Sequence, residues 1–494
     1  YYQGWGMQYS MGEIPYYVYE FFKKGIEDGN NYYSLSQTRS RSAAFFANAT
    51  YSYKGRYTVN GTARYEGTNR MGKSRSARWL PKWNESGARN AHEEKFFSNL
   101  TSVLSHFTLK ASYSLTADRG PADVTNSQAI ITSYSPYRPF TSIQESGLYI
   151  KELENSELTY EKKHELNIGA DMGFLNNRIN LAVDWYKRNN YDLIGIVNTQ
   201  GAGGQILKYA NIASMKSHGI EFTLSTKNIK TKDFNWNTDF IFSNAKNEVT
   251  DLKQNANVME LISGNGFAKQ GYPVRGLFSI PFVGLDKDGI PVIINEKGEA
   301  TSTDINFQER QNTGFLKYEG PTDPTITGSL GNMFSYKGFR LNLFINYSFG
   351  NVIRLNTVFK AYYSDLTAMT REFKNRWTLP GDETKTNVPA ILSKRMYDSN
   401  EDLKYAYNAY NYSTERIAKG DFIRLKEISL AYDFPKAWIN PLKLTDLSLK
   451  VQATNLFLIY ADDKLNGQDP EFFNAGGVAS PVPRQFTITL RLGL

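Results

Sequence analysis

The 494-residue sequence is 40% hydrophobic and 14% aromatic, with 33 tyrosines, and its mean hydropathy is −0.49. It contains no cysteine, which excludes disulfides, thiolate metal sites and cysteine nucleophiles, and its four histidines are scattered. The formal net charge of +8 arises from dispersed Lys and Arg among nearly as many Asp and Glu, and no nucleic-acid-binding motif accompanies it.

Alternating residues begin early in the chain. Residues 45–53 alternate apolar and polar side chains, a Lys54-Gly55 turn follows, and residues 57–65 alternate again. Because side chains of a strand point to opposite faces in turn, this pattern predicts a hairpin with one apolar wall and one polar wall.

The same pattern recurs along the chain. It is found at residues 166–174 with 179–185, 220–224 with 234–242, 332–350, 428–434 with 447–453, and 486–494. No run of 18 apolar residues predicts a membrane-spanning helix. In residues 332–350 a Lys337-Gly338 pair separates the two strands, and Arg340, Asn342 and Asn346 occupy the polar wall of the second strand.

Tight turns alternate with four long connections, at about 119–160, 250–320, 355–415 and 460–482. Long strands, tight turns at one end and long loops at the other are typical of an outer-membrane β-barrel, whereas a soluble β-sandwich has shorter strands. We therefore predict an all-β chain, a single transmembrane antiparallel β-barrel portion over residues 1–494, with about 14 strands here and extracellular long loops. The predicted lipid-facing residues are Phe339, Leu341, Leu343, Ile345, Phe486, Ile488, Leu490 and Leu492.

One predicted strand carries charges where apolar residues are expected. Glu85 and Arg89 stand in the apolar register of "ARWLPKWNESGARN". An Arg on the lipid face near the bilayer midplane costs about 2–4 kcal/mol. We expect Arg89 to lie near an interface, to face a partner, or to join the lumen through a register change.

Five segments, taken in order, make the pattern more specific. They include "YSYKGRYTVNGTARYEG", "HELNIGADMGFLNNRINLAVDWYKRNNYDLI", "NIASMKSHGIEFTLSTKNI", "LKYEGPTDPTITGSLGNMFSYKGF" and "GDFIRLKEISLAYDFP" with "NGQDPEFF". This ordered set resembles the C-terminal half of the SusC/RagA family of TonB-dependent outer-membrane transporters. The resemblance implies a 22-stranded barrel and a plug domain that is not visible in this sequence. We expect the chain to be part of a longer transporter, with a split half and a complete smaller porin as alternatives.

The resemblance also implies a function. Members of the family import oligosaccharides or oligopeptides across the outer membrane of Gram-negative bacteria. They act with a SusD-like surface lipoprotein as a lid, draw energy from TonB-ExbB-ExbD through the plug, and commonly form dimers of transporter–lipoprotein pairs. A passive porin and a structural barrel subunit of an envelope complex are the alternatives for this chain.

The residues themselves show no catalytic constellation, and we predict no enzyme activity and no cofactor. Two acidic turns, with Asp286 and Asp288 in one and Asp469 and Glu471 in the other, could bind Ca²⁺ in extracellular loops. We favour a solvated turn in each case, because too few ligands stand close together in the sequence. Aromatic and polar loop residues are candidates for substrate contact or for packing against the lid. These candidates are Trp377, Arg376, Tyr405, Tyr407, Tyr410 and Tyr412.

Overall fold

The computed structural model describes residues 2–4, 7–9, 20, 23, 41–120, 129–134, 147–201, 207–358, 369–473 and 483–493. Parts of the predicted loops 119–160, 355–415 and 460–482, and residue Leu494 of the last predicted strand, lie outside these described residues. None of the helices in the described ranges is long and apolar enough to cross a membrane.

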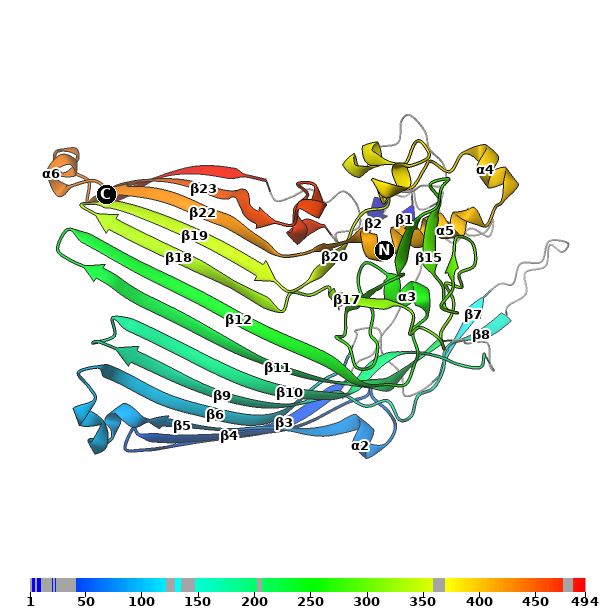
Figure 1. The fold of residues 1–494 in the computed structure, drawn as a ribbon. Coiled ribbons are helices and arrows are strands. Elements are labelled where there is room, and N and C mark those ends of the chain that lie inside the picture. Colours follow the sequence, from blue (N-terminus) through cyan, green and yellow to red (C-terminus); the bar gives the residue numbers. More distant parts are fainter. Residues whose placement is uncertain are drawn as a thin grey trace.

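One antiparallel sheet of 13 strands dominates the described residues, against about 14 strands predicted (Figure 1). Each inner strand of this sheet pairs with the preceding and the following strand of the same sheet, so the predicted hairpins are confirmed. The strands are β3 (Ser42–Tyr53), β4 (Tyr57–Thr68), β5 (Trp79–Asn90), β6 (Leu104–Asp118), β9 (Glu161–Phe174), β10 (Ile179–Asn198), β11 (Leu207–Lys230), β12 (Phe234–Leu252), β18 (Ile326–Tyr336), β19 (Phe339–Phe349), β22 (Phe422–Asp433), β23 (Asp446–Ala461) and β24 (Gln485–Gly493). Its two edges are β3 and β24.

The turn between β18 and β19 shows why these hairpins close tightly. Lys337 and Gly338 both have positive φ, 45° and 89°. Two consecutive positive φ angles are those of the two-residue turn whose twist matches that of the flanking strands. A Cβ at Gly338 would lie 2.8 Å from the carbonyl oxygen of Asp433, so the neighbouring strand leaves room only for glycine.

The register keeps apolar and polar residues on separate faces. On the apolar face Leu341 lies between Phe334 of β18 and Leu430 of β22. Large side chains of this face stay exposed, for example Val59 at 61% and Leu430 at 48%. An apolar surface of this extent, which the described residues leave uncovered, is what a lipid-facing wall presents.

Ion pairs between neighbouring strands stabilise the polar face. Lys110 on β6 pairs with Asp171 on β9 at 2.7 Å, and Arg188 on β10 pairs with Glu165 on β9 at 3.1 Å. A depression of about 440 Å³ lies on this face beside Lys110. The polar wall is therefore lined by paired charges.

Arg89 lies on the apolar face of β5, between Tyr57 and Leu109, one residue before the strand ends. It is at the tight-turn end of the sheet, so of the three expectations for Arg89 the structure supports a position near the end of the wall. Glu85 lies on the same face, between Gly61 and Tyr113.

The long connections gather at the opposite end of the sheet into what we call the loop cap, of which residues 253–325, 350–358 and 369–421 are described (Figure 1). These connections contain regular elements. These are α3 (Val258–Ile262), β13 (Gly276–Ser279), β14 (Phe282–Leu285), β15 (Pro291–Ile294), β16 (Ala300–Thr301), β17 (Lys317–Pro321), β20 (Val352–Arg354), α4 (Lys394–Ser399), α5 (Leu403–Asn411) and β21 (Ile417–Lys419). The remaining described elements are β1 (Tyr2–Gly4), β2 (Met7–Tyr9), α2 (Arg75–Arg78), β7 (Ile130–Tyr134), β8 (Gly147–Glu152) and α6 (Lys436–Ile439).

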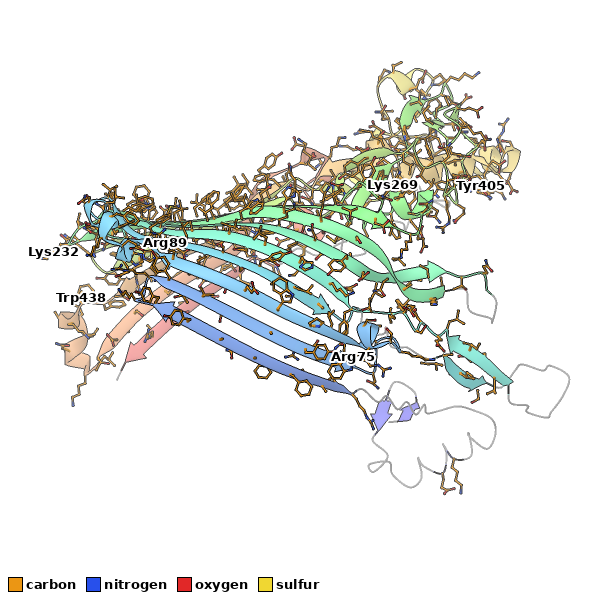
Figure 2. All side chains as sticks on the ribbon, turned by 90° about the horizontal axis from the view of Figure 1, so that it is seen from below. Arg75, Arg89, Lys232, Lys269, Tyr405 and Trp438 are labelled. Carbon is orange, nitrogen blue, oxygen red and sulfur yellow. The ribbon has the colours of Figure 1, made fainter. Side chains whose placement is uncertain are left out.

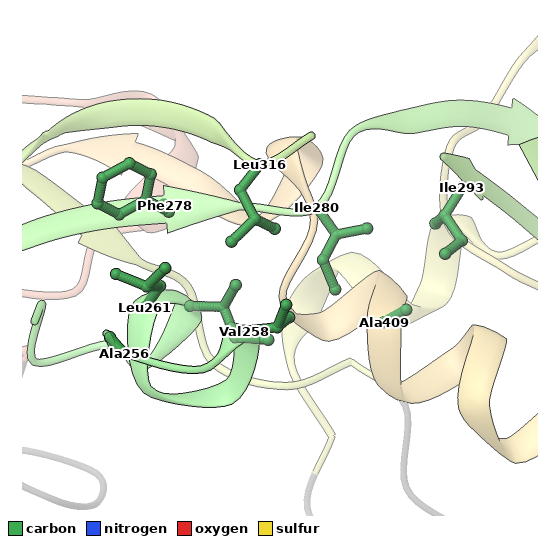
Figure 3. Close-up of a cluster of buried hydrophobic side chains, with 9 residues drawn as sticks. Ala256, Val258, Leu261, Phe278, Ile280, Ile293, Leu316 and Ala409 are labelled. Carbon is green, nitrogen blue, oxygen red and sulfur yellow. The ribbon is translucent and has the colours of Figure 1, made fainter. Parts of the chain in front are cut away.

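The loop cap has its own hydrophobic core (Figure 3). Val258 and Leu261 of α3 pack with Ile280 and with Ala409 of α5, which is far away in the sequence. The backbone of Ile280 donates to the carbonyl of Tyr412 at 3.1 Å and joins the two connections. The cap is therefore a folded unit stabilised by burial of apolar side chains.

We predict that the apolar face of β19 lies in lipid. A nitroxide on Leu343→Cys should then collide with oxygen dissolved in the bilayer, whereas one on Asn342→Cys should collide with a water-soluble nickel chelate, because adjacent residues point to opposite faces. The two accessibilities are measured by electron paramagnetic resonance in proteoliposomes. Aqueous exposure at residue 343 would contradict the assignment of the faces.

Candidate functional site

Arg354, on β20, is a buried cation at the centre of the loop cap. Its Nη1 donates to the carbonyl oxygen of Ser413 at 2.8 Å, and its Nη2 donates to those of Phe278 at 2.6 Å and Ile262 at 3.3 Å. Burial lowers the pKa of Arg354 to about 9. Since the three carbonyls belong to three separate segments, this side chain fixes α3, β13 and the end of α5 relative to one another.

Beside this anchor the cap contains a pocket of about 560 Å³. Charged groups of both signs and amide groups line it, and they come from two connections, β19–β22 and β23–β24. The lining residues are Leu355, Glu372, Asn375, Arg376, Asp382, Lys385, Thr386, Asn387, Val388, Tyr410, Glu415, Arg416 and Lys464. A concave site with converging polar groups is the usual form of a ligand site, and we call it the cap pocket.

Arg416 is a largely buried cation in the lining of the cap pocket. Its side chain is 4% exposed and forms an ion pair with Glu372. Its Nη2 also donates to the carbonyl oxygen of Asn356 at 2.6 Å, and Asn466 donates to the second oxygen of Glu372 at 2.8 Å. These contacts hold the guanidinium in place before any ligand arrives.

A turn at residues 377–385 forms another side of the pocket. The carboxylate of Asp382 accepts from the backbone N–H of Leu379 at 3.0 Å and from the Thr378 hydroxyl at 3.0 Å. These hydrogen bonds, the one from Leu379 first, lower the pKa of Asp382 to about 2. Asp382 is therefore ionised at neutral pH, and the Nζ of Lys385 lies 3.3 Å from it.

The pocket includes two of the six loop residues predicted for substrate contact, Arg376 and Tyr410. Burial raises the pKa of the Tyr410 hydroxyl, and only 1% of this residue is exposed. Arg376 stacks on the ring of Phe373, with 4.9 Å from the guanidinium to the ring centre. Substrate contact through Arg376 and Tyr410 stays a prediction.

The other four predicted residues lie outside the pocket lining. Tyr405 is 39% exposed, and Tyr407 is fully buried on the inner side of α5. The ring of Tyr412 faces the guanidinium of Arg354 at 5.9 Å. Trp377 donates from Nε1 to Glu383 at 2.9 Å and covers the turn that contains Gly289. In this structure Tyr407 offers no surface to a ligand.

The predicted calcium turns have protein partners. One oxygen of Asp286 accepts from the backbone N–H groups of Asp288 and Ile290, both at 2.9 Å. Within the described residues no group of three His, Cys, Asp or Glu side chains gathers in a metal-binding arrangement. Calcium binding at Asp286 and Asp288 stays a prediction.

The second acidic turn fastens a connection to the wall of the sheet. Asp469 accepts from Nη2 of Arg424 on β22 at 2.5 and 2.6 Å, and Glu471 lies 3.3 Å from the same nitrogen. The side chains of Arg424 and Asp469 are 4% and 8% exposed. We call this contact the latch, because it holds residues 462–473 against the polar face.

The sequence reasoning did not find Glu372, Asp382, Lys385, Arg416 or Lys464. Four of them lie in the long connection between β19 and β22, and Lys464 lies in the connection between β23 and β24. No known motif spacing relates them. The only signal was indirect, since Arg416 stands shortly before the quoted segment that begins at Gly420.

Comparisons with known proteins give a consistent result. The chain matches the family described as TonB dependent receptor-like, beta-barrel, over residues 2–456. The TonB-dependent receptor P39 of Formosa agariphila is 26% identical over 100% of this chain and 50% of its own length. The TonB-dependent receptor SusC of Bacteroides thetaiotaomicron is 25% identical over 96% of this chain and 47% of its own length.

The fold is also similar to a solved structure, that of the RagAB peptide transporter. The TM-score is 0.73 at 23% identity, and the match covers 94% of this chain and 49% of the other. The chain thus spans about half the length of the curated relatives that it matches.

We predict that Asp469→Asn releases the latch. The substitution removes the nearer and more buried of the two carboxylates that compensate Arg424, and breaking such a buried pair costs about 3 kcal/mol. Proteolysis of residues 462–473 in proteoliposomes should therefore become faster. Asp446→Asn is the control, because its pair with Lys436 is exposed on both sides and contributes about 0–1 kcal/mol. Equal cleavage rates in the two variants would contradict the role of the latch.

We further predict that Gly289→Ala displaces Trp377. A Cβ at Gly289, where φ is 74°, would lie 2.5 Å from the indole ring. Gly298→Ala is the matched control, since φ is 82° there but no atom lies within 4 Å. In the control, the free energy of unfolding falls only by the cost of placing alanine at a positive φ, roughly 1–2 kcal/mol. Thermal unfolding and tryptophan fluorescence measure the difference, and equal changes in both variants would refute the contact.

Proposed function

Because this chain belongs to the family of TonB-dependent receptor-like β-barrels, integral proteins of the outer membrane, we propose that it forms part of an active nutrient importer. The nutrients are oligosaccharides or oligopeptides. The observation that carries the proposal is the cap pocket, which lies in a folded cap at the long-loop end of the sheet.

The cap pocket suits a polar oligomer. It offers cations at Arg376 and Lys464, anions at Asp382 and Glu415, and the amide of Asn387. Side chains of both signs and amides can bind the carbonyls, amides and hydroxyls that oligopeptides and oligosaccharides present. Because Arg354 and the hydrophobic core hold the cap in shape, a ligand would lose less free energy in ordering its site.

The sheet supplies the path below the pocket. Its apolar face suits lipid, and its opposite face carries Lys110, Asp171 and other paired charges that suit an aqueous lumen. The cap pocket lies at one end of the strands, the tight turns lie at the other end, and the polar face of the sheet extends between them. A solute bound in the cap would therefore enter a polar passage toward the tight-turn end.

The proposal also includes the energy source of transport and a partner protein at the cell surface. We infer that transport depends on TonB with ExbB and ExbD, and that a SusD-like surface lipoprotein covers the cap. Support comes from the similarity to SusC of Bacteroides thetaiotaomicron and from the match in fold to the RagAB peptide transporter.

The test is uptake by cells that contain the complete protein. Labelled oligopeptides and maltooligosaccharides are offered to cells with and without the gene, before and after a protonophore collapses the inner-membrane gradient. We expect gene-dependent uptake of one of the two classes that stops with the protonophore. Uptake that continues without the gradient would identify a passive porin and overturn the proposal. Absence of any gene-dependent uptake would favour a structural barrel.

We predict that Arg376→Ala weakens ligand binding by about 10-fold. A hydrogen bond to a charged group contributes about 1.5–3 kcal/mol, and 1.4 kcal/mol corresponds to a factor of ten. Lys287→Ala is the control, because it removes the same charge from an exposed position of the cap outside the pocket lining. Isothermal titration with the transported oligomer measures both. Equal affinities in the two variants would exclude Arg376 from the binding site.

A further inference from the structure

The connection between β5 and β6 is longer than the tight turns at this end of the sheet, as is the connection between β22 and β23, which contains α6. Residues 91–103 contain two short helical turns, η1 (Ala91–Glu93) and η2 (Lys95–Asn99), where β18 and β19 are joined by Lys337 and Gly338 alone. We call residues 91–103 the foot. Figure 2 shows Arg89 at this end of the sheet, opposite the end that carries Lys269 and Tyr405 of the loop cap.

A cluster of polar contacts ties the foot to the apolar face of the sheet. Glu94 accepts a hydrogen bond from the hydroxyl of Tyr57 and lies 3.5 Å from both Arg56 and Arg89. The guanidinium of Arg89 stands 5.5 Å from the ring centre of Tyr57 and 5.8 Å from that of Phe96. Tyr57 and Arg89 are neighbours on the apolar face, so Glu94 and Phe96 of the foot lie beside that face. At the start of the foot, His92 packs against His106 of the polar face, with 4.2 Å between the ring centres.

The foot presents large apolar side chains outward. Phe96 is 60% exposed, Leu100 49% and Val103 58%. Phe97, next to Phe96, is 1% exposed and anchors η2 inward. The next turn extends this surface, because Leu175, 46% exposed, donates its backbone N–H to the carbonyl of Val103 at 2.8 Å.

We propose that the foot inserts into the headgroup region of the periplasmic leaflet, with Phe96, Leu100 and Val103 against the acyl chains. The short turns of outer-membrane barrels are on the periplasmic side, and an exposed apolar surface continuous with a lipid-facing wall is covered by the same lipid. The charges fit this depth. Lys95 is exposed on the foot and can reach the phosphates, and Arg89 at the strand end is compensated by Glu94 and two rings.

The foot therefore acts as a lateral anchor. The residues of a strand contact lipid at successive depths of the bilayer. In our proposal the apolar residues of the foot instead contact lipid together, at the depth of the headgroups. Aromatic and apolar side chains at the interface resist movement of the wall along the membrane normal. The inference rests on the outer-membrane location and not on the transported solute.

Nitroxide labels test the proposal in the complete protein. Cysteines are introduced at Phe96, Leu100 and Val103, and at Glu93 as the polar control on the same foot; residues 1–494 contribute no other thiol, and the unmutated protein gives the background. Collision rates with oxygen and with a water-soluble nickel chelate are measured in vesicles of phosphatidylethanolamine and phosphatidylglycerol. We expect the ratio of oxygen to nickel accessibility to be several-fold higher at the three apolar positions than at residue 93.

Two results would overturn the proposal. A ratio equal to that of residue 93 at all three positions would place the foot in water. Low accessibility to both reagents would mean that protein covers it, such as a periplasmic partner or another part of the same transporter. Glu94→Gln in the Val103→Cys background gives a second readout, because loss of the contacts with Arg56 and Arg89 should raise nickel accessibility several-fold. Unchanged accessibility would show that Glu94 does not position the foot.

Discussion

The structure depends on one constraint, that backbone N–H and C=O groups in hydrocarbon must be paired within the protein. The pairing of β3 with β4 runs without interruption from Ser42 opposite Thr68 to Tyr53 opposite Tyr57. Continuous pairing forces the two-residue alternation of side chains, and the alternation produces one apolar and one polar face. The same constraint applies to the two edges, β3 and β24, whose outer backbone groups need partner strands when the sheet lies in a membrane.

In the loop cap, buried backbone carbonyls outside helices and sheets need other hydrogen-bond donors. Arg354 donates to three of these carbonyls, and among the described residues these bonds, rather than a carboxylate in direct contact, stabilise the buried guanidinium. Lysine offers a single point of donation, whereas the planar guanidinium reaches several acceptors at once. The low polarity that lowers the pKa of Arg354 also strengthens these hydrogen bonds.

The sequence predicted the sheet well because a period of two is a local signal. It located the hairpins, the Lys337-Gly338 turn and the separation of faces in β19. It missed the strands of the cap, such as β13 (Gly276–Ser279), because four residues are too short for a periodic pattern. The sequence made Tyr407 and Tyr410 candidates for contact with a substrate or with the lid, but it did not show the helix α5, on which residues three and four apart share the buried face. The cap pocket could not be predicted, since only the tertiary fold brings Glu372, Arg416 and Lys464 together.

The contacts around the cap pocket continue into the wall of the sheet. Glu372 joins Arg416 to Asn466, and Asn466 lies in the connection that the latch holds against β22 through Asp469 and Arg424. The ion pair between Arg416 and Glu372 lies in the lining of the cap pocket, and Glu372 also accepts a hydrogen bond from Asn466. Residues 462–473 are therefore joined both to the pocket lining, through Glu372, and to the polar face, through the latch.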